Sequence, residues 1–162
     1  MKNRYFGLTL LLIYALSGHA NGQPAPSSLR LNHIALQVTN LEASTRFYQQ
    51  VLGLDTIANP FNDGRHTWLQ IPGSGHLHLI VSPTQEAPVM PLKQTHFCFS
   101  LPNVEFFASK LKQLNIPYED WPGQPQTITL RADGVRQLYL QDPDGYWIEI
   151  NDDYARKRRR KR

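Results

Sequence analysis

The chain has 162 residues, a single cysteine (Cys98) and a formal net charge of +4 at pH 7. One cysteine excludes an intramolecular disulfide, so packing, a metal or a partner subunit must hold the fold. The positive charge comes from the two ends: nine of the 17 basic residues are Lys2, Arg4 and the run Arg156–Arg162, which leaves eight against 13 acidic residues. The body of the chain is therefore acidic.

Residues 1–20 have the plan of a secretory signal peptide. A basic start is followed by an apolar run over Tyr5–Leu16, and small residues near Ala20 stand where a signal peptidase cuts. The alternative is a membrane anchor, but the apolar run is shorter than the ~20 residues that a span needs. Cleavage predicts a mature chain from about Asn21, a flexible lead-in over residues 21–29, and export to the periplasm or the cell exterior.

Residues 154–162 form a basic tail. Like charges repel one another and none of these side chains can be buried, which is typical of a disordered extension. The alternative is that the tail binds an anionic surface such as lipid headgroups. A nucleic-acid partner is not expected, because no aromatic residues interleave the tail and an exported chain rarely meets nucleic acid.

The middle of the chain repeats itself. A strand around His33 is followed by Asn40, a good helix N-cap, and by a helical apolar pattern that includes Leu41, Phe47, Leu52 and Leu54. A strand around His96 is followed in the same way by Asn103 and by a stripe at Val104, Phe107, Leu111 and Leu114. His33 and Asn40 thus each stand 63 residues before their counterparts, which indicates an internal duplication.

The second half of each repeat reads as a hairpin. The stretch WLQIPGSGHLHLI aligns with YLQDPDGYWIEI at an offset of 71, with turn residues in both. Each repeat therefore predicts a strand, a helix, a short strand and a hairpin. One domain is expected over residues 30–153, with modules at about 30–82 and 95–152 joined by the proline-rich loop Ser82–Pro91.

Four repeat-related positions carry side chains that bind metals. His33 corresponds to His96, and His78 corresponds to Glu149. If the two copies pack about a pseudo-twofold axis, equivalent positions near the axis converge on one point. Three imidazoles and one carboxylate there would form an ordinary site for a divalent metal.

These motifs resemble the vicinal oxygen chelate superfamily, which includes glyoxalase I, extradiol dioxygenases, methylmalonyl-CoA epimerase, fosfomycin-resistance enzymes and bleomycin-binding proteins. The stretch LNHIALQVTNLEASTRFYQQVLGL resembles its opening module and DPDGYWIEI its closing hairpin, and the similarity covers about Arg30–Asp152. It implies an α+β fold of two tandem βαβββ modules that form an open, barrel-like cleft around a metal. Such modules are often completed by dimerisation, so two arrangements stay open: the modules close within one chain, or across a homodimer.

On this resemblance, His33, His96 and Glu149 match a His, His, Glu ligand triad. His78 stands where glyoxalase-type members have a carboxylate and epimerase-type members a glutamine, so a histidine there is a departure. Its interpretations, in order, are a tentative fourth ligand, a general base beside the metal, and a pocket residue that never contacts the ion. The expected cofactor is one divalent metal: iron, manganese, nickel or zinc.

Tyr139 is, with His78, the second candidate catalytic residue. It matches a position where fosfomycin-resistance members place a tyrosine that contacts the substrate. Trp68 is its counterpart in the first repeat. The alternative for both aromatic residues is a place in the core of the sheet.

Other side chains on the ligand faces could line a pocket. His76 and Cys98 are candidates, although an exposed histidine and a plain buried thiol are the preferred interpretations. Arg65, Arg131 and Arg136 border the hairpins and could receive an anionic substrate, whereas surface arginine is the default.

Two functions remain open. The first is an exported metal-dependent enzyme acting on a small oxygen-rich substrate, of the lyase, isomerase or ring-cleaving dioxygenase type. The second is a non-catalytic protein that binds or sequesters a small molecule, as bleomycin-binding members do; those typically lack the ligands present here. Glyoxalase I and fosfomycin thiol transferases use a cytosolic thiol, so export argues against both. Fold alone does not choose the reaction.

Overall fold

A computed structural model describes residues 29–73, 75–84 and 92–153. The predicted signal peptide, most of the lead-in, most of the proline-rich loop and the basic tail lie outside the described residues and stay predictions. No helix within the described ranges is long and apolar enough to cross a membrane.

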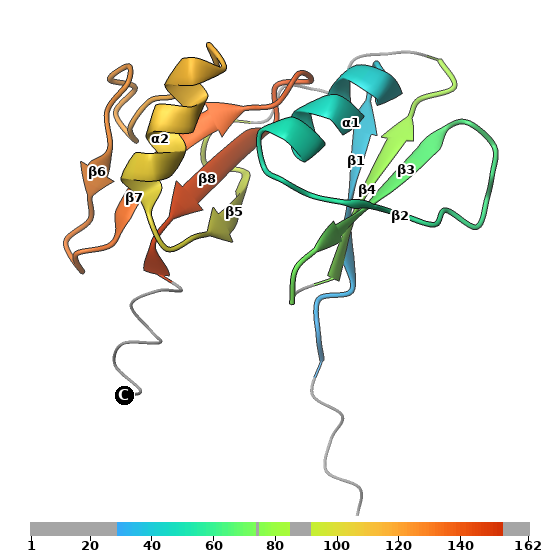
Figure 1. The fold of residues 1–162 in the computed structure, drawn as a ribbon, viewed down its shortest axis with the longest axis horizontal. Helices are drawn as coiled ribbons and strands as arrows, with labels where there is room; N and C mark the ends of the chain where they lie inside the picture. Colours follow the sequence, from blue (N-terminus) through green and yellow to red (C-terminus); the bar gives the residue numbers. More distant parts are fainter. Residues whose placement is uncertain (1–28, 74, 85–91, 154–162) are drawn as a thin grey trace, which may run out of the picture. The chain divides into compact units, whose positions relative to one another are not determined.

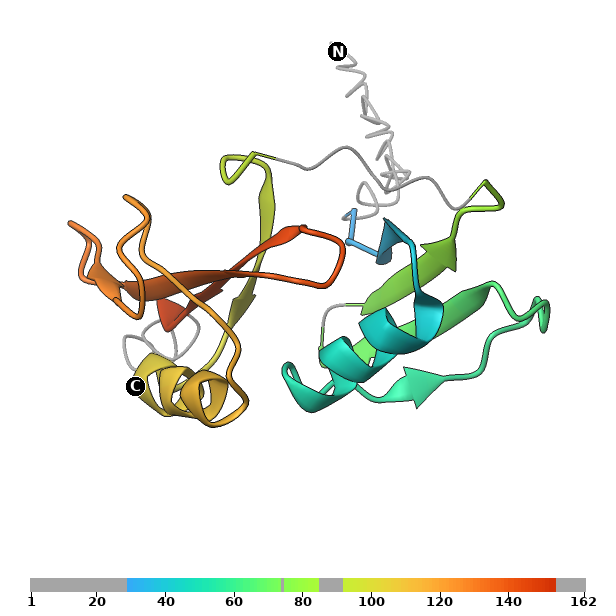
Figure 2. The same cartoon turned by 90° about the horizontal axis from the view of Figure 1, so that it is seen from above.

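The first module contains one four-stranded sheet and one helix (Figure 1). Its elements are β1 (His33–Val38), α1 (Leu41–Gln50), β2 (Thr56–Ile57), β3 (His66–Ile71) and β4 (Gly75–Val81). The strand order is β1-β4-β3-β2, in which β1 and β4 run parallel and the other pairs antiparallel. Helix α1 packs on one face of this sheet, and no other helix of the described residues covers the opposite face (Figure 2).

The second module has the same topology. Its elements are β5 (His96–Ser100), α2 (Val104–Gln113), β6 (Thr129–Leu130), β7 (Arg136–Gln141) and β8 (Trp147–Asn151). The order β5-β8-β7-β6 again places the one parallel pair at the start of the sheet. The predicted α+β fold with two βαβββ modules is therefore confirmed, as two separate sheets and no closed barrel among the described strands, which is compatible with an open cleft.

The strand register reproduces the repeat residue by residue. His33 lies opposite His76 in the first sheet, and its counterpart His96 lies opposite Trp147 in the second. Two residues further along these strands, Ala35 lies opposite His78, and Cys98 lies opposite Glu149. Each candidate ligand on a first strand is therefore the diagonal neighbour of the candidate on the last strand of its own module.

Both helices begin at the predicted caps. The Asn40 side chain accepts a hydrogen bond from the amide of Ala43, and Asn103 accepts one from Phe106. Helix α2 buries the predicted stripe at Val104, Phe107 and Leu111. Leu114 is instead the C-cap that follows the last helical residue, and it is exposed.

Helix α1 differs from the prediction in what it buries. Its fully buried residues are Ser44 and Tyr48, whereas Leu41 and Phe47 are only partly covered. Polar groups at these buried positions need partners, which a search for apolar periodicity does not anticipate. The partners come from the other module.

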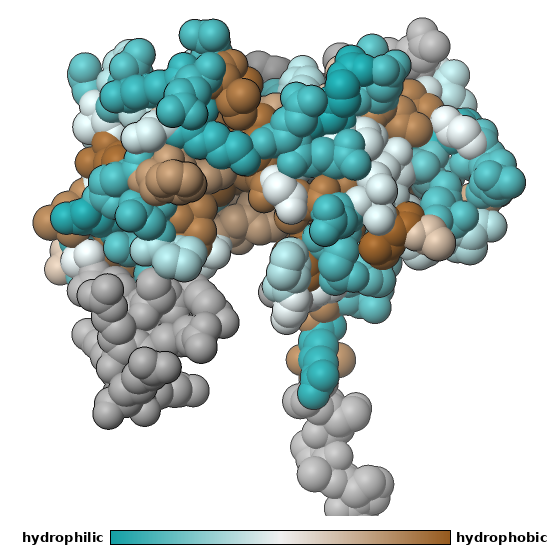
Figure 3. Space-filling model, viewed as in Figure 1, coloured by the Kyte–Doolittle hydropathy of each residue, from teal (hydrophilic) through white to brown (hydrophobic). Residues whose placement is uncertain are grey.

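The core lies between the helices and the helix-facing sides of the strands. On β1 and β4, Leu36, Val38, Leu77 and Leu79 alternate with the histidines of the opposite face and are buried. Their counterparts in the second module include Ile148 and belong to the same core cluster. On the face seen in Figure 3, hydrophilic residues surround scattered hydrophobic ones.

The turn of the β7–β8 hairpin is hydrogen-bonded to the start of α1. Asp144 accepts hydrogen bonds from the Thr39 amide at 2.8 Å, the Thr39 hydroxyl at 2.6 Å and the Ser44 hydroxyl at 2.8 Å. Asp142 accepts one from the Tyr48 hydroxyl at 2.7 Å. Burial raises the pKa of the Asp142 carboxyl, and burial together with Asp142 raises that of Tyr48. These bonds tie the two modules together.

Asp144→Ala should therefore destabilise the protein markedly. The substitution leaves three donors without their acceptor, one of them the hydroxyl of the fully buried Ser44. We expect a loss of roughly 2–4 kcal/mol in the free energy of unfolding. Urea unfolding of the variant and of Asp133→Ala provides the comparison, since Asp133 is an exposed partner of Arg131 and its removal should cost much less stability. Equal losses in the two variants would contradict the inter-module role.

Candidate metal centre

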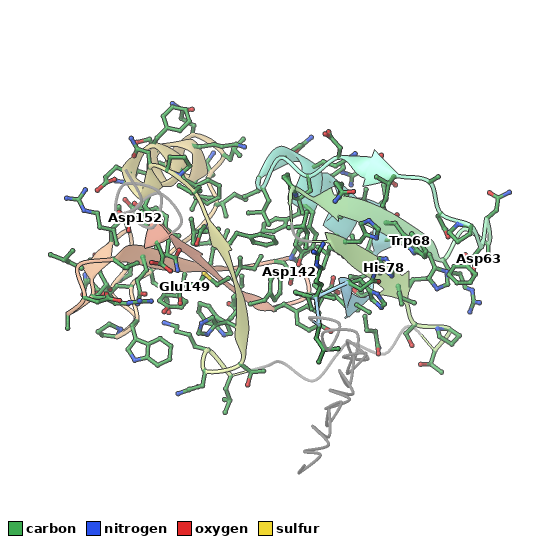
Figure 4. All side chains as sticks on the ribbon, turned by 90° about the horizontal axis from the view of Figure 1, so that it is seen from below. Asp63, Trp68, His78, Asp142, Glu149 and Asp152 are labelled. Atoms are coloured by element: carbon green, nitrogen blue, oxygen red, sulfur yellow. The ribbon has the colours of Figure 1, made fainter. Side chains whose placement is uncertain are left out.

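The open face of the second sheet joins His96 to Glu149. The His96 Nε2 atom lies 3.1 Å from Glu149 Oε2, across the parallel pair β5 and β8. Glu149 is buried and His96 half-buried. Figure 4 shows Glu149 on its strand, among the side chains of this sheet.

The hydrogen bond at the other ring nitrogen determines which His96 atom is available. The His96 Nδ1 atom lies 2.7 Å from the carbonyl oxygen of Lys93, which can only accept, so Nδ1 carries the proton. In a neutral ring, the Nε2 atom then carries a lone pair that faces a carboxylate oxygen of Glu149. Both atoms are acceptors, so no hydrogen bond can join them directly. A proton on Nε2 or a cation shared by the two atoms satisfies both. Their orientation fits a metal ligand pair.

Glu149 is kept ionised by its neighbours. Burial by itself raises the pKa of its carboxyl, but donors from Asn151 at 2.8 Å and Tyr139 at 2.8 Å, with Cys98 and the field of His96, lower it overall. Arg131 Nη1 lies 3.9 Å from Glu149 Oε1. A buried carboxylate with a pKa below its usual value is ready to bind a cation.

Tyr139 acts on the carboxylate as a donor. Its side chain is buried, and burial followed by the hydrogen bond to Glu149 raises the pKa of the phenol. A phenol of this kind stays protonated and is no general base. The geometry therefore gives Tyr139 the role of orienting Glu149, while contact of Tyr139 with a substrate stays a prediction.

Cys98 lies beside the same carboxylate without the properties of a nucleophile. Desolvation, followed by the charge of Glu149, raises the pKa of its thiol to about 12. The Asn151 amide donates to its sulfur at 3.1 Å. The thiol therefore remains protonated. The preferred interpretation as a plain buried thiol is wrong, because Cys98 lies on the open face of the second sheet, which α2 does not cover, and its side chain is exposed.

The open face of the first sheet carries a stack of aromatic rings. The His78 ring lies 4.4 Å from the His33 ring and 4.1 Å from the Trp68 ring, centroid to centroid, with interplanar angles of 7° and 5°. Figure 4 shows Trp68 and His78 side by side on neighbouring strands. His76 extends the stack at larger distances.

Two polar atoms in this stack have no partner. The Nε2 atom of His78 and the Nε1 atom of Trp68 are buried and make no hydrogen bond. Burial first, and the neighbouring histidines His33, His76 and His66 next, lower the pKa of His78, so its imidazole is neutral. A buried, neutral and unpartnered imidazole nitrogen is suited to metal ligation or to accepting a proton.

His33 resembles His96 in which ring nitrogen is hydrogen-bonded. Its Nδ1 atom lies 2.7 Å from the Asn32 side-chain oxygen, which fixes the proton on Nδ1 and leaves Nε2 as the lone pair. The two repeat-related histidines thus expose the same ring nitrogen, although the acceptor is an amide oxygen in one case and a backbone carbonyl in the other.

The predicted ligands form two pairs in the structure. His33 contacts His78 in the first sheet, and His96 contacts Glu149 in the second. Within the described ranges, no group of three or more histidine, cysteine or acidic side chains lies close enough to hold a metal. Assembly of the four into one centre therefore stays a prediction.

The three candidate arginines differ in their surroundings. Arg131 lies beside Glu149 and also pairs with Asp133. Arg65 and Arg136 are exposed and pair with acidic neighbours, Asp63 and Glu105. Only Arg131 of the three is placed next to a predicted ligand.

Three residues at the centre were missed by the sequence analysis: Lys93, Trp121 and Asn151. Asn151 stands two residues after Glu149 on the same strand, so the period of two could have placed it on the ligand face. Lys93 and Trp121 come from loops, where no periodic pattern indicates which side chains converge. Trp121 lies 6.3 Å from His96 and 5.5 Å from Tyr139, ring to ring.

The chain is similar to known proteins over most of its length. Residues 30–150 match the model of the Glyoxalase/Bleomycin resistance protein/Dioxygenase superfamily. Glyoxylase I 4 of Arabidopsis thaliana is 31% identical over 129 residues, 74% of this chain and 68% of the relative. Lactoylglutathione lyase of Pseudomonas putida is 26% identical, covering 81% of this chain and 89% of the relative. Metallothiol transferase FosB of Staphylococcus epidermidis is 29% identical, over 75% and 80%.

Solved structures agree with the fold. Oxidase ChaP-H2 superposes with a TM-score of 0.63 at 25% identity, over 77% of this chain and 94% of that chain. Lactoylglutathione lyase from Agrobacterium tumefaciens has a TM-score of 0.57 at 22% identity, over 80% and 96%. The duplicated topology, the paired ligand candidates and the match over residues 30–150 agree, and the chain belongs to the Glyoxalase/Bleomycin resistance protein/Dioxygenase superfamily.

Proposed function

We propose that this protein is an exported metal-dependent enzyme whose substrate is a small molecule with two adjacent oxygen atoms. One observation carries the proposal: His33 and His96, at equivalent places of the repeat, both hold Nδ1 against a fixed acceptor, which leaves Nε2 as the free ring nitrogen, and the ring of each lies beside a second ligand candidate. Relatives named as a lyase, a thiol transferase and an oxidase support an enzyme of this superfamily.

The side chains divide the work of the site among them. His33, His96 and Glu149 would hold a divalent metal, with His78 as a fourth ligand or as the base that removes a proton from the substrate. Such a metal, when bound, supplies Lewis-acid stabilisation of an oxyanion. Tyr139 and Asn151 hold the Glu149 carboxylate in place by donating to its two oxygens. Lyase, isomerase and ring-cleaving dioxygenase reactions all suit these roles.

A binding or sequestering protein is the second candidate. The two unpartnered buried atoms of Trp68 and His78 favour it specifically, because a bound molecule could satisfy them without any reaction. Metal dependence separates the two candidates. An enzyme of the proposed type needs the ligand residues for turnover, whereas a sequestering protein binds its ligand without them.

We further propose that a second copy of the chain completes the centre. A divalent metal in an N/O site takes four or more ligands, and among the described residues each sheet brings two of the predicted ligands together. In a homodimer with twofold symmetry, the pair on the first sheet of one subunit would meet the pair on the second sheet of the other, and two equivalent centres would form.

Metal analysis of protein purified without chelators tests the ligands. The wild type should hold about one divalent metal per chain, and His96→Ala and Glu149→Ala should lose most of it. His66→Ala is the matched control, since this histidine lies on the same sheet as His78 but bonds to Asp63. His78→Ala loses metal if His78 is a ligand and keeps it, without turnover, if it is a base. A wild type that holds and binds no metal overturns the proposal.

A mixing experiment tests the shared centre. His33→Ala and His96→Ala homodimers each lack a ligand in both centres, but a mixed dimer has one intact centre. Unfolding and refolding the two together should restore about one quarter of the wild-type metal content, because half of the dimers are mixed and each regains one of two centres. Each variant refolded alone gives the baseline, and refolded wild type is the control. If the mixture regains no metal above the baseline, the centre lies within one chain.

The export part of the proposal has its own measurement. Mass spectrometry of the protein recovered from outside the cytoplasm should find a chain that begins near Asn21, because signal peptidase removes residues 1–20. A protein recovered only from the cytoplasm with its first 20 residues attached contradicts export and leaves the metal centre untouched.

A further inference from the structure

We propose that Trp121 is a substrate-contacting residue, and that its indole stacks against a planar, conjugated group that carries the two chelating oxygens. The inference rests on the proposed metal centre and narrows its substrate class to molecules with an aromatic or similarly flat ring. It follows from the exposure of Trp121, its rigid support and its place beside His96.

Trp121 is a large apolar side chain left exposed at the centre. Its exposed fraction is 43%, although its ring contacts both His96 and Tyr139. Leaving an indole in water forgoes the stabilisation that burial would give. A ring in this position presents apolar surface within reach of the atoms that His96 and Glu149 would bind.

The loop that carries Trp121 is tied to the sheet. The backbones of Glu119 and Tyr139 exchange hydrogen bonds in both directions, at 2.9 and 2.8 Å. The Asp120 side chain accepts from the amides of Gly123 at 2.9 Å and Gln124 at 2.7 Å, which closes the turn. The exposed indole is therefore held in place from two sides and is not the tip of a loose loop.

Lys93 fastens the same loop from the other side. Its ammonium group donates to the carboxylate of Glu119 and to the carbonyls of Asp120, at 3.0 Å, and Trp121, at 3.2 Å. The carbonyl of Lys93 itself accepts the Nδ1 proton of His96. One residue thus contacts both the loop that carries the indole and a candidate metal ligand.

A preorganised indole beside a candidate ligand favours flat substrates. Stacking on a rigid ring costs little conformational entropy, and offset aromatic pairs gain energy beyond the area they bury. A compact aliphatic chelator would bind the metal without reaching the indole. The expected preference is therefore for chelating groups fused to, or conjugated with, a ring.

Two chelating probes of different shape test this. 4-Nitrocatechol presents adjacent oxygens on an aromatic ring, and acetohydroxamate presents them without a ring. In the metal-loaded protein, Trp121→Ala should weaken 4-nitrocatechol binding about tenfold and change acetohydroxamate binding less than about twofold. Trp121→Phe, which keeps an aromatic face, should bind 4-nitrocatechol within about threefold of the wild type.

The matched control is Phe106→Ala. Phe106 is also a large exposed aromatic residue, on α2 and away from the candidate ligands, and its removal should leave both affinities and the metal content unchanged. Equal effects of Trp121→Ala on the two probes, or none on 4-nitrocatechol, overturn the role of Trp121 and leave the metal centre standing. A wild type that binds neither metal nor either probe overturns the proposed function, and the inference falls with it.

Discussion

The acidic turn of the second hairpin is the contact on which the arrangement of the modules depends. Asp142 and Asp144 accept four hydrogen bonds from Thr39, Ser44 and Tyr48, and most of these groups are withdrawn from water. Breaking such a contact leaves several buried polar groups unsatisfied at once, which gives the contact direction and cooperativity that apolar packing lacks. A hairpin turn from one module thus fixes the helix of the other.

This contact also breaks the symmetry of the repeat. The positions in α2 that correspond to Ser44 and Tyr48 are Phe107 and Leu111, and the first hairpin has Ile71 where the second has Asp142. All three of these apolar residues belong to the core cluster. At these repeat-related positions, one copy therefore carries polar side chains and the other carries apolar ones. The polar side chains form hydrogen bonds with particular residues of the other module, whereas the apolar side chains stabilise the fold by burying apolar surface.

The helices, the hairpins and the alternation of faces follow from local physics and could be predicted. Asn40 and Asn103 cap helices because their side chains accept from the next turn, and the period of two sends His76 and His78 to the face opposite Leu77. Burial of Ser44 and Tyr48 could not be predicted, because it depends on carboxylates about one hundred residues away. The same holds for Lys93 and Trp121, whose loops meet the sheet through bonds that no local pattern indicates.

The two candidate half-sites differ in how they keep their ligands ready. In the second sheet, Glu149 is held by donors from Tyr139 and Asn151, so its charge is maintained by hydrogen bonds despite burial. In the first sheet, His78 is held by stacking between two flat rings and is neutral because it is buried. A charged carboxylate and a neutral imidazole are the forms that bind a divalent cation, and each is obtained here by the opposite means. Gene duplication supplied two equivalent positions, and the side chains around them made one an anion and the other a neutral base.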